Sequence, residues 1–256
     1  MANWLRFRHG AENYFGTLEG ESITVYEGDL FDNPRPTEHT QSLDNVEILI
    51  PCHPSKMVGL WNNVRSAAVK QGWAIPEEPF SFIKPPSCYL PHRGIIRKPN
   101  SYSGRVVYEG ELAIVIGRQC ANVTIEESPD VIFGYTCAND VTALQLINQD
   151  ESFQQWSRAK GFDTFGVFGP TIKTDISPDE LIVKTELNGR VRQDYPVSDF
   201  VFSPAEIVAA ISRDTTLFPG DVILCGTGNG VLPMKPGSKV EIVIEGIGTL
   251  SNTFAA

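Results

Sequence analysis

Short apolar runs rich in β-branched residues recur along this chain, and they constrain its fold more than any other feature. They are separated by Gly, Pro and Asn and do not alternate with long helical patterns, which argues against a doubly wound α/β fold. Between two such runs, the pair Asn188–Gly189 predicts a tight hairpin. The clearest helix is predicted at Pro204, with Ser203 as its N-cap and Glu206 completing a capping box. The sequence therefore predicts a mainly β protein of the α+β class.

The beginning of the chain has its own pattern. Its alternating apolar runs are broken by Gly and Asn, as in a small β-meander. Residues 29–42 are rich in Pro, Asp and Thr, which predicts a loop or linker, and apolar patterning restarts near 45–55. We therefore expect a small N-terminal β domain over 1–50 and a larger domain over 51–256.

Composition limits the class of protein. The 256 residues include 31 acidic and 21 basic side chains, giving a net charge of −10, which argues against a nucleic-acid or anionic-membrane partner. No apolar stretch is long enough to span a bilayer and no signal-peptide pattern is present, so a cytoplasmic protein is expected. Scattered cysteines without a C-x-x-C pair are expected to be buried reduced thiols: Cys52, Cys88, Cys120, Cys137 and Cys225.

Three carboxylates define the candidate site. Glu109 and Glu111 stand two residues apart in the run 105–118, which is expected to be one strand, so their side chains leave the same face. Asp140 ends a second apolar segment, 132–140. Clustered acids among core residues need a neutralising cation, and oxygen ligands without nearby His or Cys suit Mg²⁺ or Mn²⁺. The alternative is that the two glutamates are solvated acids beside a turn.

Two lysines and a glycine-rich loop are further candidates. Lys84 closes an apolar strand before Pro-Pro, and Lys160 lies in a Gly- and aromatic-rich segment expected to be a loop. Either ammonium would contact a substrate carboxylate or an enolate oxygen; the alternatives are an ion pair for Lys84 and a solvated surface position for Lys160. Gly226 and Thr227 follow an apolar strand and would present N–H groups and a hydroxyl to an anion, or form a tight turn.

Taken in order, these segments resemble the fumarylacetoacetate hydrolase family over roughly residues 55–254. The resemblance lies in FIKPPS, YEGELAIVIGR, GYTCANDVTA, KGFDTFGVFGP, LNG, PGDVILCGTGNGV and VEIVIEGIGTLSN. It implies a mixed β-sandwich roll, usually a homodimer, with a small N-terminal β domain in many members. It also implies that Glu109, Glu111 and Asp140 bind Mg²⁺ or Mn²⁺.

The resemblance also implies the chemistry. Family members bind small anionic 2-oxo acids or their enols, and they hydrolyse, decarboxylate or isomerise them. All three reactions share an enolate stabilised by the metal. Lys84, Lys160 and Thr227 match family positions in the K-P-P segment, in K-G-F-D-T and in the late glycine-rich loop.

The chain departs from the family pattern in residues 61–80, which are expected to form a lid and to contain a short helix over 64–72. Hydrolytic members carry a His and a Glu there that activate water. Arg65 stands at or near the His position, and an arginine cannot act as a general base. Glu77 or Glu78 would have to substitute. We therefore expect isomerisation, tautomerisation or decarboxylation rather than hydrolysis.

A second departure is Leu144, where many members have an arginine that contacts the substrate carboxylate. One hypothesis is that Arg65 makes this contact from the lid; the alternative is a solvated lid arginine beside a more apolar pocket. Two further functions stay open, a C–C hydrolase of acylpyruvate-like diketo acids and a non-catalytic metal- and ligand-binding protein. Candidate apolar pocket residues are Trp61, Trp73, Phe80 and Leu144.

Overall fold

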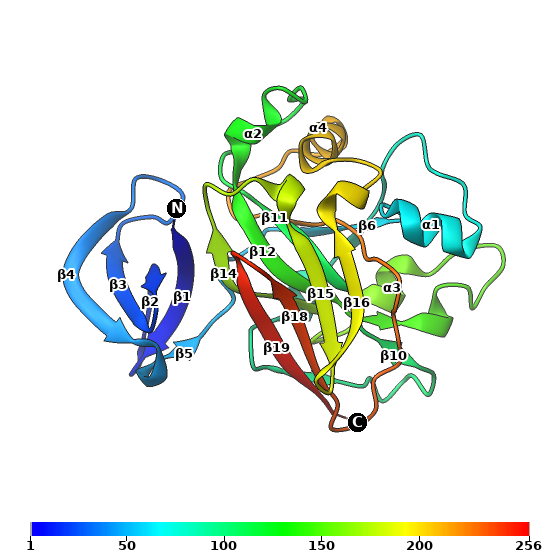
Figure 1. The fold of residues 1–256 in the computed structure, drawn as a ribbon, viewed down its shortest axis with the longest axis horizontal. Helices are drawn as coiled ribbons and strands as arrows, with labels where there is room; N and C mark the ends of the chain where they lie inside the picture. Colours follow the sequence, from blue (N-terminus) through cyan, green and yellow to red (C-terminus); the bar gives the residue numbers. More distant parts are fainter. Residues whose placement is uncertain (1, 256) are drawn as a thin grey trace.

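The computed structural model describes residues 2–255 and is built mainly from β-strands (Figure 1). One large mixed sheet packs against a five-stranded sheet, and two very short strands form a separate pair. Helices are few and short. The prediction of a mainly β protein with few helices is confirmed.

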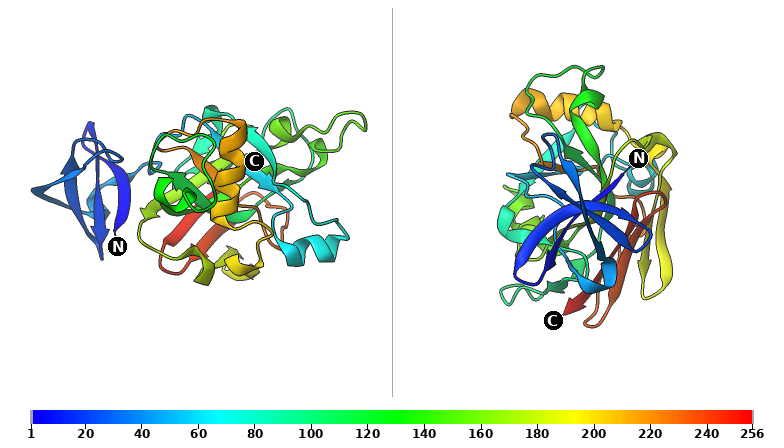
Figure 2. Two further views of the ribbon diagram at one scale, coloured as in Figure 1. Left: turned by 90° about the horizontal axis from the view of Figure 1, so that it is seen from above. Right: turned by 90° about the vertical axis from the view of Figure 1, so that its left-hand side faces the viewer.

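A β-meander forms the N-terminal part of the chain. Consecutive strands pair antiparallel in the order β4-β3-β2-β1, and β5 pairs antiparallel with Phe7 and Arg8 of β1. The strands are β1 (Asn3–His9), β2 (Glu12–Glu19), β3 (Ser22–Glu27), β4 (Arg35–Ser42) and β5 (Glu47–Ile48), with the 3₁₀ turn η1 (Leu43–Asn45) between the last two. The left view of Figure 2 shows this meander as a small body at one end of the molecule.

The prediction of a loop over 29–42 is wrong for its second part, which forms β4. This strand is the outer edge of the meander, where Pro36 is tolerated because one side of the strand needs no hydrogen-bond partner. Its hydroxyl-bearing neighbour Thr37 donates to the carbonyl of Val25 at 2.9 Å. Proline-rich composition therefore marked an edge strand here rather than a linker.

The meander continues directly into the large sheet. β1 pairs with β14, and the order continues β14-β12-β11-β17-β6-β7, with β8 also on β14. Trp4 is buried at the junction, with its ring 4.8 Å from that of Tyr26 and 6.2 Å from that of Phe133. The strands are β6 (Met57–Trp61), β7 (Phe80–Lys84), β8 (Tyr89–Leu90), β11 (Gly110–Ile116), β12 (Ile132–Asp140), β14 (Gly166–Lys173) and β17 (Val222–Leu224).

The second sheet packs on β11 and β12. Leu112 and Ile114 of β11 share a core with Ile242 of the second sheet, whereas Ala113 and Val115 face a second core on the opposite side. Burial on both faces explains the unbroken apolar sequence of β11. In pairing order the sheet contains β16 (Arg190–Pro196), β15 (Ile182–Leu187), β18 (Lys239–Ile244), β19 (Gly248–Ala255) and β9 (Ile95–Arg97).

The local signals for turns and helix ends are confirmed. Asn188 and Gly189 join β15 to β16 with φ angles of 52° and 71°, as a tight hairpin turn requires. α4 begins at Pro204 behind Ser203, and both hydrogen bonds of the capping box with Glu206 are present. The helices are α1 (Arg65–Gln71), α2 (Ser128–Val131), α3 (Trp156–Lys160) and α4 (Pro204–Asp214), and the other 3₁₀ turns are η2 (Pro86–Cys88), η3 (Leu144–Leu146), η4 (Pro178–Glu180) and η5 (Val197–Asp199).

The single strand expected over 105–118 is interrupted. β10 (Val106–Val107) pairs with β13 (Thr142–Ala143), and the long strand β11 begins only at Gly110. Glu109 therefore lies in the break, just before β11. Glu109 is therefore held outside the regular strand that carries Glu111.

All five cysteines are buried and free, as predicted. Within residues 2–255, no helix combines the length and the apolar character needed to cross a lipid bilayer.

Candidate active site

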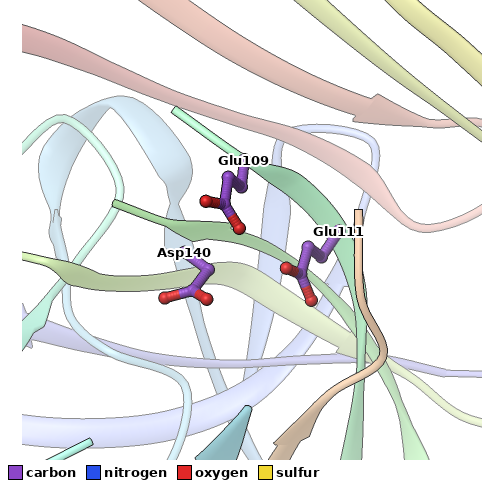
Figure 3. A group of neighbouring side chains, drawn as sticks. All are labelled: Glu109, Glu111 and Asp140. Carbon is purple, nitrogen blue, oxygen red and sulfur yellow. The ribbon is translucent and has the colours of Figure 1, made fainter. Parts of the chain in front are cut away.

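The register between β11 and β12 places three carboxylates together. Glu111 lies opposite Ala138, and Asp140 follows two residues later on the same face of β12. Glu109, in the break before β11, accepts the N–H of Asp140 with its carbonyl oxygen at 2.9 Å. One oxygen from each of the three carboxylates lies within 4.8 Å of the others (Figure 3). The structure thus brings together the three predicted metal ligands.

Gly110 separates the two glutamates and touches the second sheet. A Cβ atom at this position would collide with Oγ1 of Thr185 on β15, so the close approach requires glycine. Its N–H donates to Oε1 of Gln193 at 3.0 Å. Its carbonyl accepts from the hydroxyls of Tyr195 at 2.8 Å and Thr227 at 2.9 Å. These bonds fix the backbone from which both acids project.

Two buried lysines contact the acids. Lys84, at the end of β7, donates from Nζ to Oδ1 of Asp140 at 2.5 Å and to the carbonyl of Lys160. Lys160 donates from Nζ to Oδ2 of Asp140 at 2.5 Å and to Oε2 of Glu109 at 2.7 Å. The ion pair expected for Lys84 is confirmed. The expected loop and the solvated alternative for Lys160 are wrong, because this residue ends α3 and is 2 % exposed.

Burial and unequal charge shape the electrostatics of this cluster. Burial raises the pKa of Glu111 well above its usual range, and the charges of Asp140 and Glu109 raise it further. Burial also raises the pKa of Glu109, against the opposing effect of Lys160. For Asp140, burial alone would raise the pKa, but Lys160 and Lys84 outweigh it and lower the pKa. With all three carboxylates ionised, the three acids and two ammonium groups leave one net negative charge in the cluster.

The donor set fits a divalent cation. Oε2 of Glu111 accepts the N–H of Gly226 at 2.6 Å, whereas its Oε1 is buried and has no hydrogen-bond partner in the described part of the chain. The oxygens of Glu109 and Asp140 each retain a second lone pair beside their bonds to lysine. Carboxylate oxygens are the donors that Mg²⁺ and Mn²⁺ prefer. These three residues would hold the ion. Its two positive charges would change the net charge of the cluster from one negative to one positive.

The loop after β17 closes over the acids. Gly226, at φ 94°, directs its N–H to Glu111, which places this loop at the cluster. The hydroxyl of Thr227 donates to Gly110 and accepts from Nε2 of Gln193 at 2.8 Å. In this arrangement the hydroxyl holds the loop to the strand. Its expected contact with a substrate carboxylate stays a prediction.

Sequence reasoning missed two residues of β16 that support this loop. Besides its bonds to Gly110 and Thr227, Gln193 donates to the carbonyl of Gly228 at 2.9 Å and is 1 % exposed. Tyr195 lies two residues further on the same face, and its hydroxyl donates to the carbonyl of Gly110. The available signal was the alternation of Gln193, Tyr195 and Val197, which places the glutamine on the inner face of the strand.

Arg65 is not brought to the acids. It begins α1, is exposed, and donates from Nη2 to the carbonyl of Val201 at 3.0 Å. The next residue, Ser66, donates its N–H to Oδ2 of Asp199 at 3.1 Å, so two contacts hold the start of α1. The helix ends at Gly72, which has φ 70° and agrees with the predicted stop. A substrate contact for Arg65 stays a prediction.

Two models of known families match this chain. A family model described as "Fumarylacetoacetate (FAA) hydrolase C-terminal" matches residues 56–255. A second model, described as "Rv2993c-like, N-terminal", matches residues 3–51. The two matches together span nearly all of the chain.

Three similar proteins have descriptions that name an activity. The oxaloacetate tautomerase YisK of Bacillus subtilis is 36% identical over 225 residues, which cover 82% of this chain and 74% of that protein. The crystal structure of 2-hydroxyhepta-2,4-diene-1,7-dioate isomerase from Mycobacterium marinum aligns with a TM-score of 0.91 and 37% identity, covering 100% of this chain and 98% of the other. Fumarylpyruvate hydrolase from Pseudomonas aeruginosa, in complex with Mn²⁺ and pyruvate, aligns with a TM-score of 0.74 and 25% identity, covering 86% of this chain and 92% of the other. The chain belongs to the fumarylacetoacetate hydrolase family.

Proposed function

We propose that the protein is a divalent-metal-dependent enzyme that acts on a 2-oxo or 2-hydroxydienoate carboxylic acid through an enolate. Its reaction would be isomerisation or tautomerisation, with decarboxylation as another outcome of the same enolate. One observation carries the proposal: the carboxylates of Glu109, Glu111 and Asp140 share a buried compartment with two lysine ammonium groups. The tautomerase and isomerase relatives support an enzyme of this kind.

The charge of the compartment suits an anionic substrate. A bound Mg²⁺ or Mn²⁺ would act as a Lewis acid and stabilise negative charge that develops on a substrate oxygen. The three acids and two lysines carry one net negative charge, which two further positive charges would convert into one net positive charge. A 2-oxo acid with one carboxylate would restore neutrality.

The two lysines have different surroundings, so we assign them different roles. Lys160 bridges Glu109 and Asp140, and we assign it the stabilisation of the enolate oxygen and the transfer of a proton. Lys84 binds Asp140 and the backbone of Lys160, so it positions both groups. Tautomerisation removes the proton from the enol oxygen on C2, delivers one to C3, and shifts the double bond to C2–O. It requires no water.

The lid supports tautomerisation over hydrolysis. A hydrolase needs a base that activates water, and Arg65 stands where hydrolytic members have histidine. Glu77 and Glu78, the other candidates, are exposed. Hydrolysis of acylpyruvate-like diketo acids is nevertheless a second candidate function, because the chain also aligns with fumarylpyruvate hydrolase.

A ¹H NMR time course in D₂O tests the proposal. The protein is incubated with Mg²⁺ or Mn²⁺ and either oxaloacetate or acetylpyruvate, with EDTA as one control and the variant Glu111→Gln as another. Metal-dependent deuterium exchange at C3 of oxaloacetate, or release of pyruvate from it, is the expected result. The variant Glu47→Gln changes a surface acid of β5 and should behave like the wild type.

The alternatives give different products in the same experiment. Formation of acetate and pyruvate from acetylpyruvate would contradict the preference for tautomerisation and identify a hydrolase. Metal binding without exchange or product, with both acids, would contradict an enzyme for such substrates.

We further propose that the protein is a homodimer in solution, as the family resemblance implies. Size-exclusion chromatography with light scattering measures this directly. A mass near twice 28.2 kDa is expected, and a monomer mass would contradict the proposal.

A further inference from the structure

Aromatic side chains from three separate segments meet beside the lysine-acid cluster. They come from β6, from the lid and β7, and from α3, and their ring contacts form one connected row. We call this row the aromatic wall; its members are Trp61, Trp73, Phe80, Phe82 and Trp156.

The inner end of the aromatic wall lies at the candidate active site. Nζ of Lys160 lies 5.1 Å from the ring centroid of Phe82, over its face. The ring of Phe82 stacks on that of Trp156 at 5.6 Å with an interplanar angle of 21°. The lysine that binds Glu109 and Asp140 therefore also contacts the first ring of the wall.

The outer end of the aromatic wall reaches solvent. Trp61 contacts Trp156 at 5.8 Å, Trp73 at 5.0 Å and Phe80 at 5.9 Å between ring centroids. Trp73 and Phe80 are 42% and 48% exposed. Exposing large rings is unfavourable, and a continuous exposed apolar surface beside a site commonly serves binding.

The aromatic wall offers little to a second charged group on a ligand. Within residues 2–255, Lys160 is the one cation that lies over a ring of the wall. The indole N–H of Trp156 is already used, since it donates to Oε1 of Gln154 at 2.9 Å. Lys70 of α1 and Arg158 of α3 are exposed, and within the described chain neither lies over a ring of the wall.

We propose that the aromatic wall binds a planar, uncharged carbon substituent on C3 of the 2-oxo acid, such as an aryl or conjugated group. Its rings would stack on that substituent while the carboxylate and the 2-oxygen face the acids and lysines. The preferred substrates are then aryl- or alkenyl-substituted 2-oxo acids with one carboxylate, rather than short dicarboxylates. This inference rests on the proposed function and specifies its substrate class.

Enol tautomerisation of two acids tests the inference. The enol of phenylpyruvate carries an aryl group on C3, and the enol of oxaloacetate carries a second carboxylate there; the loss of each enol is followed by ultraviolet absorbance with Mn²⁺ present. The wild type should have the higher kcat/KM for phenylpyruvate. Trp73→Ala and Trp61→Ala should each lower the ratio of the two kcat/KM values by about three- to tenfold, mainly by raising KM for phenylpyruvate.

A matched control separates the wall from general effects of losing a ring. Phe218 is 41% exposed, close to the exposure of Trp73, and its ring is contacted by the ammonium of Lys56. Phe218→Ala should leave both kcat/KM values unchanged. An unchanged ratio in both tryptophan variants, with wild-type turnover of oxaloacetate intact, would overturn the inference and leave the proposed function standing.

A binding measurement covers the case in which neither enol is turned over. Benzoylformate and glyoxylate are 2-oxo acids that cannot enolise, and isothermal titration of the Mg²⁺-loaded protein compares their affinities. Tighter binding of benzoylformate that is lost in Trp61→Ala would support the aromatic wall as a binding surface even if the proposed reaction fails. Equal affinities for the two acids would overturn the inference.

Discussion

The backbone N–H of Gly226 donates to Oε2 of Glu111 at 2.6 Å, and within residues 2–255 this is the one hydrogen bond that the Glu111 carboxylate accepts. A backbone dipole from one strand end thus orients a buried acid from a neighbouring strand. The other carboxylate oxygen of Glu111 faces Glu109 and Asp140. A cation bound there would therefore meet a carboxylate that the backbone already holds in place.

Added metal should stabilise the fold. A cation that binds only the folded state raises the free energy of unfolding, by about 2.7 kcal/mol at a concentration 100 times its Kd. We therefore expect Mn²⁺ or Mg²⁺ to raise the Tm in differential scanning calorimetry and EDTA to reverse the change. Glu111→Gln should abolish most of this shift, whereas Glu47→Gln should keep it. Equal Tm values with metal and EDTA for the wild type would contradict the assigned site.

Gln193→Leu should weaken the loop that closes over the acids. The substitution keeps similar volume but leaves the N–H of Gly110 and the carbonyl of Gly228 without their partner. Unpaired buried groups of this kind cost about 3 kcal/mol together, measurable by urea denaturation. Because Gly110 lies between two ligands, we also expect about tenfold weaker Mn²⁺ binding by titration calorimetry. Gln149→Leu, at an exposed site, should change neither quantity.

His92 should make stability depend on pH in the acid range. Burial lowers its pKa from 6.5 to about 4, and its Nδ1 accepts the N–H of Ser251 at 3.1 Å. Between these two values the unfolded chain binds a proton that the folded protein does not, so the free energy of unfolding falls as pH falls. The loss is about 2 kcal/mol after allowance for solvent at a partly exposed ring, and it is absent above pH 6.5.

His92→Asn tests this linkage because asparagine keeps an acceptor and does not titrate. Urea denaturation of the variant at several pH values should lose the contribution of His92 between pH 6.5 and 4. An identical pH dependence in both proteins would refute the assignment.

The stability that the capping box gives to α4 should depend on the hydrogen-bond acceptor at position 203 rather than on the size of the side chain. Ser203→Ala removes the hydroxyl that accepts the N–H of Glu206, and we expect a loss of about 1 kcal/mol. Ser203→Asp should retain most of the stability because aspartate is a good N-cap residue. The midpoints of urea denaturation of the two variants and the wild type measure these losses. Equal losses of stability in Ser203→Ala and Ser203→Asp would argue against a capping role.

Much of the site can be predicted from the sequence because it depends on short-range rules. The spacing of Glu109 and Glu111 and the position of Asp140 at the end of an apolar segment made the three acids candidates, and the resemblance to the family selected them as metal ligands. The apolar run that ends just before Pro85 likewise places Lys84 at the end of a strand. Capping and turn residues likewise depend on near neighbours, and α4 and the hairpin at Asn188 were predicted correctly.

The remaining features depend on contacts between distant segments. The break before Gly110 arises because residues 106–107 pair with 142–143, which the local apolar pattern does not reveal. Lys160 is buried because Asp140 and Glu109, distant in the chain, compensate its charge. Gln193 contacts the site only through packing of the second sheet on the first. β4 shows the reverse case, in which an edge position made a proline-rich segment compatible with a strand.

The pairing of β1 with β14 covers part of the edge of β14. One side of β14 binds β12, the strand that carries Asp140, and its other side is shared by β8 at Gly166–Val167 and by β1 at Ile172–Lys173. Without residues 3–51, the end of this strand would present free N–H and carbonyl groups next to the apolar surface now covered by Trp4. Such an edge is a template for another chain, so we expect the meander to shield this sheet from self-association and aggregation.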